Sequence, residues 1–183
     1  MRLRKFISLT LVVVCSAYLL VPTPSFPNPP ADSLQSNEPG DIESPLRRSY
    51  FTNFSRDEVM RHYVDQFSIS KSSLWDIPLP PYTLNYPPED AQTKIRDLAR
   101  STFLEEIIHT LRESVFVNGF EPKEAKDAIE IAGKPWRQKI TIRYYPSSVR
   151  SRIVALILIV ISIWYLLKEY SRVFLDLRRL VRK

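Results

Sequence analysis

Residues 152–183 have the sequence RIVALILIVISIWYLLKEYSRVFLDLRRLVRK, in which an uncharged apolar run is followed by a basic tail. The run, residues 153–167, contains eleven Ile, Val or Leu residues among its fifteen. As a helix it would be about 22 Å long, and the flanking Arg152 and Lys168 can extend their charged ends to the two surfaces of a bilayer. A buried core helix is the alternative, but such helices seldom lack a polar face. The pattern therefore predicts a transmembrane helix over residues 151–168.

The tail, residues 169–183, places apolar side chains on one helical arc and charges on the opposite side. The apolar residues are Tyr170, Val173, Phe174, Leu177, Leu180 and Val181. This spacing predicts a basic amphipathic helix in the cytoplasm, which lies on an anionic membrane surface or against a partner helix. The residues expected to contact the membrane surface are Arg172, Arg178, Arg179, Arg182 and Lys183. The alternative is a helical flank that only stops translocation.

In residues 1–21, three basic residues precede a stretch of sixteen mostly apolar residues. Such a segment is either a retained signal anchor or a cleaved signal peptide. Ser16 and Ala17 would permit cleavage, but no clear Ala-x-Ala site follows, so we favour the anchor. Cys15 is the only cysteine of the chain, which excludes an intramolecular disulfide.

The basic residues are concentrated beside the two apolar segments. Residues 1–21 carry a net charge of +3 and residues 168–183 a net charge of +4, whereas residues 22–152 carry −1. Because cytoplasmic flanks of membrane helices are enriched in Lys and Arg, both termini are expected in the cytoplasm and the central domain outside it. The lipid bilayer is the expected partner. A nucleic-acid partner is not expected, since it would need a basic folded domain.

Between the apolar segments the composition changes once. Residues 22–46 contain seven of the fifteen prolines and few large apolar side chains, which predicts an extended, semi-rigid linker. Residues 47–146 have the size of one small domain. Helical patterns followed by strand patterns, without a βαβ rhythm, predict that this domain is α+β, with an antiparallel sheet and two helices.

The first helix of the domain has a capping box, in which Ser55 caps the helix and Glu58 bonds back to the Ser55 amide. A strand is expected just before it, over residues 49–54. A second helix is expected from Pro88, with an apolar face that continues to Phe103 and Ile107. The apolar face of the first helix comprises Val59, Met60, Tyr63, Val64 and Phe67, and that of the second begins with Ala91, Ile95, Leu98 and Ala99.

Two turn signals follow. Asn118–Gly119 predicts a turn, and Gly133–Lys134 is expected to join two strands. The second of these strands alternates the apolar residues Ile140, Ile142 and Tyr144.

No pattern indicates catalysis, and no cofactor or metal site is expected. Glu58 with His62, and Glu106 with His109, have helical spacing, and Glu-x-x-His occurs in carboxylate-bridged metal centres. Such centres need two copies of the motif, whereas one copy is present, so we favour ordinary polar pairs. The three glycines of the chain do not form a phosphate-binding loop, and no Gly-x-Ser-x-Gly motif occurs.

The stretch SLWDIPLPPYTLNYPP, rich in proline and aromatic residues, is predicted to be a loop, and it is the most suggestive feature for binding. Its aromatic residues, with one from the later strands, could line a groove, because rigid aromatic side chains give contact area at low entropic cost. The groove would be formed by Trp75, Tyr82, Tyr86 and Trp136. Aromatic residues that only cover the sheet are the alternative, and the more ordinary one.

The run YPPEDAQTKIRDLARSTFLEEIIHTLRESVFVNGFEP, followed by KITIRYYP and an apolar helix, resembles uncharacterised membrane-anchored proteins of small-genome bacteria. The resemblance covers about residues 50–167. It implies a cell-membrane location and this architecture, and it implies no activity and no site residue.

Two classes of function are compatible with these patterns. The first is a non-enzymatic protein of the cell envelope, whose extracytoplasmic domain binds other membrane or envelope proteins or serves in assembly. The second is a membrane-tethered enzyme, such as a metal-dependent one. We favour the first, because the sequence has no convincing acid–base or metal-binding constellation.

Overall fold

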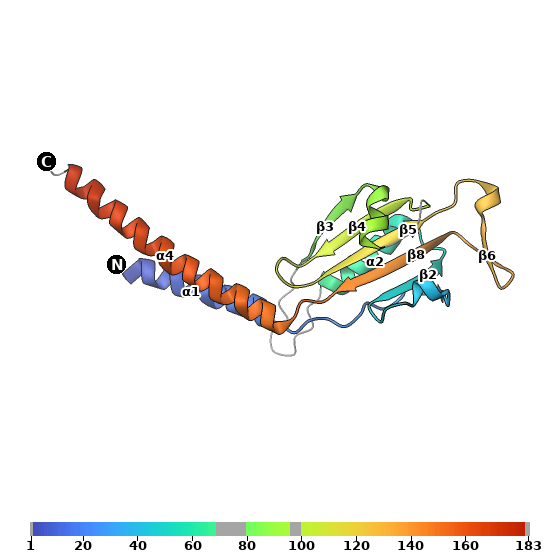
Figure 1. Cartoon of the computed structure of the whole chain (residues 1–183), viewed down its shortest axis with the longest axis horizontal. Helices are drawn as coiled ribbons and strands as arrows, with labels where there is room; N and C mark the ends of the chain where they lie inside the picture. Colours follow the sequence, from blue (N-terminus) through green and yellow to red (C-terminus); the bar gives the residue numbers. More distant parts are fainter. Residues whose placement is uncertain (1, 69–79, 96–99, 182–183) are drawn as a thin grey trace. The chain divides into compact units, whose positions relative to one another are not determined.

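The protein contains a six-stranded antiparallel sheet whose strands lie in the order β1-β2-β8-β5-β4-β3 (Figure 1). The computed structural model describes residues 2–68, 80–95 and 100–181. The strands of this sheet are β1 (Leu34–Gln35), β2 (Arg47–Thr52), β3 (Tyr82–Tyr86), β4 (Phe103–Ile108), β5 (Ser114–Phe120) and β8 (Gln138–Tyr145). The α+β class and the antiparallel sheet are confirmed. The chain forms two compact units, residues 22–146 and residues 1–21 with 147–183.

Helix α2 (Arg56–Ser68) covers one face of the sheet, and its start is the predicted capping box. The Ser55 amide donates to Glu58 Oε2 over 2.7 Å, and the Val59 amide donates to the Ser55 carbonyl. These bonds satisfy amides that a helix start leaves unpaired. The predicted apolar face is confirmed, because the helix buries Val59, Met60, Tyr63 and Phe67. With them pack Tyr50, Phe103, Ile107, Val115, Val117, Ile140, Ile142 and Tyr144.

The opposite face of the sheet carries short helices, among them the 3-10 turn η2 (Pro88–Asp90) and the single turn α3 (Ala91–Lys94). The predicted second helix therefore begins near Pro88 but does not continue, since Phe103–Ile108 is strand β4. A spacing of four residues fits one face of a helix and also one face of a strand, so Phe103 and Ile107 satisfied both patterns. Leu98 and Ala99, also assigned to that helix, lie outside the described residues.

The Asn118–Gly119 turn prediction is wrong, because both residues lie inside strand β5. Gly119 pairs with Phe103 of β4, and a Cβ atom at Gly119 would overlap the Phe103 ring. The glycine is therefore required by packing: it leaves room for an aromatic ring against the strand backbone.

Replacing Gly119 with alanine should lower the free energy of unfolding by about 1–3 kcal/mol, the usual cost of overpacking a core. Gly40→Ala is the matched control, because nothing lies within 4 Å of a Cβ atom there. Urea unfolding of the full chain in detergent micelles would measure both changes. Equal effects would contradict the packing role assigned to Gly119.

Two further differences concern strands. Strand β3 lies inside the stretch predicted as an aromatic and proline-rich loop. The predicted pair of strands around Gly133 is the hairpin of β6 (Ile129–Ile131) and β7 (Lys134–Trp136), and Ile140, Ile142 and Tyr144 belong to the separate strand β8. The turn residues Ala132 and Gly133 both have positive φ, of 54° and 72°, which suits a tight hairpin turn.

The segment predicted as a linker belongs to the folded unit. Residues 22–33, called the strap below, have neither helix nor strand but pack along α2 and β8. Further along, Asp41 of the 3-10 turn η1 (Pro39–Asp41) is buried and accepts hydrogen bonds from Ser36 and Ser49. Donors of the domain bind carbonyl groups of this segment, so it packs with the sheet and α2.

The second unit is a pair of helices, α1 (Arg2–Leu20) and α4 (Val149–Val181), which pack against each other (Figure 1). The side chain of Arg152, near the start of α4, donates to the carbonyls of Leu19 and Val21 at the end of α1, so the two helices are antiparallel. Within the described residues, one helix is long and apolar enough to cross a membrane, with the candidate span Val149–Val173. The tail prediction of a helix is confirmed to residue 181, but this helix continues α4 without a break.

Candidate functional site

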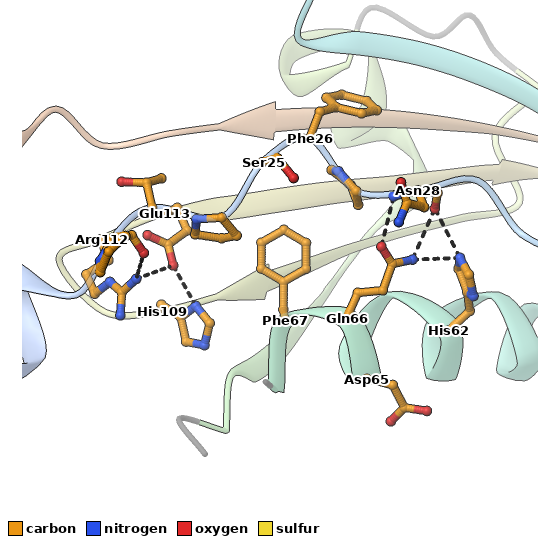
Figure 2. A pocket seen from close by; sticks show the side chains of 14 residues that line it. Ser25, Phe26, Asn28, His62, Asp65, Gln66, Phe67, His109, Arg112 and Glu113 are labelled. Carbon is orange, nitrogen blue, oxygen red and sulfur yellow. Dashed lines mark hydrogen bonds and ion pairs between the residues drawn. The ribbon is translucent and has the colours of Figure 1, made fainter. Parts of the chain in front are cut away.

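A pocket of about 670 Å³ lies between the strap, the end of α2 and the turn between β4 and β5 (Figure 2). The strap supplies its proline-rich wall, and the aromatic rings of Phe26 and Phe67 give it an apolar lining. The opposite wall carries polar groups. The lining residues are Pro22, Thr23, Pro24, Ser25, Phe26, Pro27, Asn28, His62, Asp65, Gln66, Phe67, His109, Arg112 and Glu113.

The β4–β5 turn is held by a buried charged cluster. Its backbone closes through the His109 amide, which donates to the Glu113 carbonyl, and the Arg112 amide, which donates to the His109 carbonyl. Glu113 Oε1 lies 2.9 Å from His109 Nδ1 and 3.1 Å from Arg112 Nη2. The side chains of Arg112 and Glu113 are fully buried, so each charge compensates the other in a place that water does not reach.

The strap is bound through its carbonyl groups. Proline has no amide hydrogen, so a proline-rich chain offers acceptors and few donors, and the domain must supply the donors. Arg112 Nη2 donates to the Pro22 carbonyl over 3.2 Å, and the Tyr144 hydroxyl donates to the Pro24 carbonyl over 2.7 Å. Gln66 bonds the Asn28 backbone twice, accepting from its amide at 2.8 Å and donating to its carbonyl at 3.0 Å.

Aromatic contacts supplement these bonds. The Phe26 ring meets the Tyr144 ring edge-on at a centroid distance of 6.3 Å, and Tyr144 in turn lies 6.1 Å from the Phe67 ring. Donors combined with aromatic rings are also how proline-rich peptides are bound by other domains. These donors and rings thus hold the acceptor-rich strap in place as one wall of the pocket.

The two metal-site patterns of the sequence do not form. Glu106 lies in β4 and accepts a bond from the Tyr86 hydroxyl, whereas His109 faces Glu113, because a strand does not place residues three apart on one face. Glu58 caps α2, and His62 bonds the Asn28 carbonyl. In the part of the chain that the structure describes, no three His, Cys, Asp or Glu side chains are placed to hold a metal ion.

One pocket residue, His109, is a histidine with a carboxylate partner. A histidine oriented by a carboxylate can serve as a general acid or base where its ring reaches a substrate. His109, however, is only 5% exposed, and its pairing with Glu113 and Arg112 is explained by the need to close the turn. Sequence patterns did not reveal this cluster, because its partners in the strap lie about ninety residues earlier in the chain. The one available signal was the adjacent charged pair Arg112–Glu113 between two apolar stretches.

The predicted aromatic groove is not assembled from its residues. Tyr82 and Tyr86 lie on β3, at one edge of the sheet, whereas Trp136 is buried in β7 beside Asn53 and Phe54, in a different hollow. Trp75 lies outside the described residues. Tyr86 has a specific polar role, since its hydrogen bond to Glu106 raises the pKa of the Tyr86 hydroxyl to about 12.

Of the residues expected at the membrane surface, Arg172 is exposed on α4 and pairs with Glu169 at 2.7 Å. Arg178 and Arg179 fall within the same helix. Arg182 and Lys183 lie outside the described residues.

Comparison of the chain with protein-family models, with curated proteins and with solved structures finds no match.

Replacing Tyr144 with phenylalanine removes the donor that holds the Pro24 carbonyl while keeping the ring. The free energy of unfolding should fall by about 0.5–1.5 kcal/mol, and hydrogen exchange at the strap amides of Thr23, Ser25 and Phe26 should become faster. Tyr82→Phe, the same change at a half-exposed edge position, is the control. Unchanged strap exchange in the Tyr144 variant would show that this bond does not hold the strap.

Proposed function

We propose that the protein is a non-enzymatic component of the cell envelope, anchored by both α1 and α4, which presents its α+β unit outside the cytoplasm to bind other envelope or membrane proteins. The binding part of the proposal is supported by a pocket whose polar groups hold an extended chain and whose histidines serve structure. The anchoring part is supported by one interaction, the bond between Arg152 and the end of α1.

Arg152 is 3% exposed, and its Nη1 lies 2.7 Å from the Val21 carbonyl and 3.2 Å from the Leu19 carbonyl. Those carbonyls end a helix, where they have no partner within the helix and where a cation is favoured. Cleavage of the N-terminal segment would remove the helix that supplies these acceptors. A buried guanidinium without acceptors is costly, which supports retention of α1.

The surfaces of the two helices also fit a bilayer. α4 exposes large apolar side chains around most of its circumference, with Ile157, Ile161 and Leu166 between 52% and 65% exposed. An apolar surface of this kind is unusual in water and ordinary in lipid. In α1 the Thr10 and Ser16 hydroxyls donate to carbonyls one turn earlier, so they present no free donor to lipid.

The antiparallel pairing of α1 and α4 agrees with the distribution of basic residues along the chain. Because the end of α1 lies beside the start of α4, the basic start of α1 and the residues from Lys168 onward fall at the same end of the pair. Enrichment of Lys and Arg on one side is the pattern of cytoplasmic flanks. Both termini in the cytoplasm is therefore the topology that we propose.

Membrane-impermeant maleimide added to sealed cells should label Asn37→Cys and should not label Lys183→Cys, each in a Cys15→Ser background. Asn37 is exposed in the folded unit, whereas the neighbouring Ser36 is buried and unsuitable as a probe. The intact mass of the purified protein should include residues 1–21. Labelling at position 183, or a mature chain without its N-terminal segment, would overturn the proposed anchoring.

Arg152→Met should weaken the helix pair by about 1.5–3 kcal/mol, the range for a hydrogen-bonded charged group, because it removes the donor and keeps the length of the side chain. Arg150→Met is the matched control, since Arg150 is exposed. Titration of the full chain with sodium dodecyl sulfate in mixed micelles would measure both. If the two variants lose equal stability, Arg152 does not join the helices.

A further inference from the structure

Two arginines lie directly opposite each other on neighbouring strands of the sheet. Arg47 of β2 and Arg143 of β8 are register partners, so their side chains emerge on the same face of neighbouring strands. This is the face opposite α2, because Tyr50 and Ile142 pack under α2 and lie an odd number of positions from Arg47 and Arg143, three and one respectively. Like charges directly opposite in an antiparallel pair repel each other. The pair is therefore expected to have a negatively charged partner that offsets this repulsion.

Arg47 is 5% exposed, and its Nε is buried with no hydrogen-bond partner among the described residues. The nearest carboxylate is that of Glu43, whose Oε1 lies 3.9 Å from Arg47 Nη1 and 3.9 Å from Arg143 Nη1. That distance is beyond a hydrogen bond but within an ion pair, so this carboxylate oxygen is shared by the two guanidinium groups as a long ion pair.

Other acidic groups near this face are already engaged. Asp41 accepts bonds from Ser36 and Ser49 and pairs with Lys139 at 2.7 Å. Burial alone would raise the pKa of Asp41, but hydrogen bonds from Lys139, Ser36 and Ser49 outweigh it and leave the pKa below its usual value. The Asp41 charge is thus matched by Lys139, and it does not neutralise the arginine pair.

We propose that Arg47 and Arg143 form a binding site for a phosphate-type oxyanion, which takes the place that Glu43 Oε1 occupies in this structure. Arginine nitrogens donate to phosphate oxygens over about 2.8 Å, and a tetrahedral anion has enough oxygens to accept from both groups. Since both Nη1 atoms lie 3.9 Å from one point, an anion centred near that point reaches both. Arg143 and Glu43, each partly exposed, form the entrance.

The surroundings of the pair favour a small, strongly charged ligand. Arg143 lies 5.5 Å from the Tyr145 ring centre, and its other register partner is Phe116, so aromatic rings limit the movement of its guanidinium group. Arg47 is held by burial. Two pre-positioned cations with one displaceable carboxylate suit an anion that is more highly charged than a carboxylate.

Phosphate could come from a soluble phosphate compound or from a lipid headgroup. In the sequence Arg143 lies six residues before Val149, the first residue of membrane helix α4, so both sources are chemically reasonable.

The test distinguishes a soluble phosphate compound from a lipid headgroup. It uses the full chain in maltoside micelles, which contain no phosphate, in a buffer free of phosphate, sulfate and carboxylate. One series adds inorganic phosphate against chloride at equal ionic strength, and the other adds phosphatidylglycerol to the micelles, with binding measured by calorimetry.

Wild-type protein should bind at least one of the two probes. Arg143→Gln should weaken binding tenfold or more, and Arg143→Lys should restore only part of it, because a lysine cannot form the planar fork. Glu43→Gln should strengthen binding threefold or more, since it removes the competing carboxylate. Lys134→Gln, which removes an exposed cation from the β6–β7 hairpin, should leave binding unchanged.

The direction in which Glu43→Gln changes phosphate affinity decides between the two roles of Glu43. If Glu43 only stabilises the two arginines, removing its charge lowers stability and does nothing for phosphate affinity. Absence of binding to both probes by folded wild-type protein would overturn the proposal. Equal loss of affinity in the Arg143→Gln and Lys134→Gln variants would also overturn it, because binding would then reflect net charge alone. Binding of phosphatidylglycerol alone would identify a headgroup site, and binding of inorganic phosphate a site for soluble anions.

Discussion

The pairing of strand β8 with β2 on one side and β5 on the other is the constraint on which the rest of the unit formed by residues 22–146 depends. Without β8 the sheet would separate into β1-β2 and β5-β4-β3. β8 also supplies Ile140, Ile142 and Tyr144 to the core beneath α2, while its opposite face carries Thr141 and Arg143 to the polar side of the sheet. Strand β8 thus contributes residues to the core, to the contact with the strap through Tyr144, and to the arginine pair.

The strap shows how a proline-rich segment becomes part of a folded unit. Its carbonyls are met by a guanidinium, a phenol and a side-chain amide that come from three different elements. Each bond is modest in water-exposed surroundings, but together they order a segment that has no regular structure of its own. The charged cluster of the β4–β5 turn, which could be mistaken for an acid–base site, is one of these anchors.

Local patterns in the sequence predicted local structure well. The capping box at Ser55, the apolar face of α2, the hairpin turn near Gly133 and the α+β class are confirmed, because each depends on residues within a few positions of each other. Prediction failed where contacts are distant in sequence. The residues near Gly119 in the sequence do not indicate that the Phe103 ring lies against it. The residues near the prolines do not indicate which donors bind the carbonyl groups of the strap. The candidate site was missed for the same reason.

The position of β8 in the chain has a consequence for how the protein is made. Ser49 and Thr141, which meet between β2 and β8, are 92 residues apart, and β8 is the last strand before helix α4. The two parts of the sheet can be joined only when almost all of residues 22–146 have been synthesised. Until then β2 and β5 each lack a neighbour, and pairings of such sequence separation form slowly. A nascent chain of this protein therefore carries two open strand edges for most of its synthesis, the period in which a chaperone would protect it best.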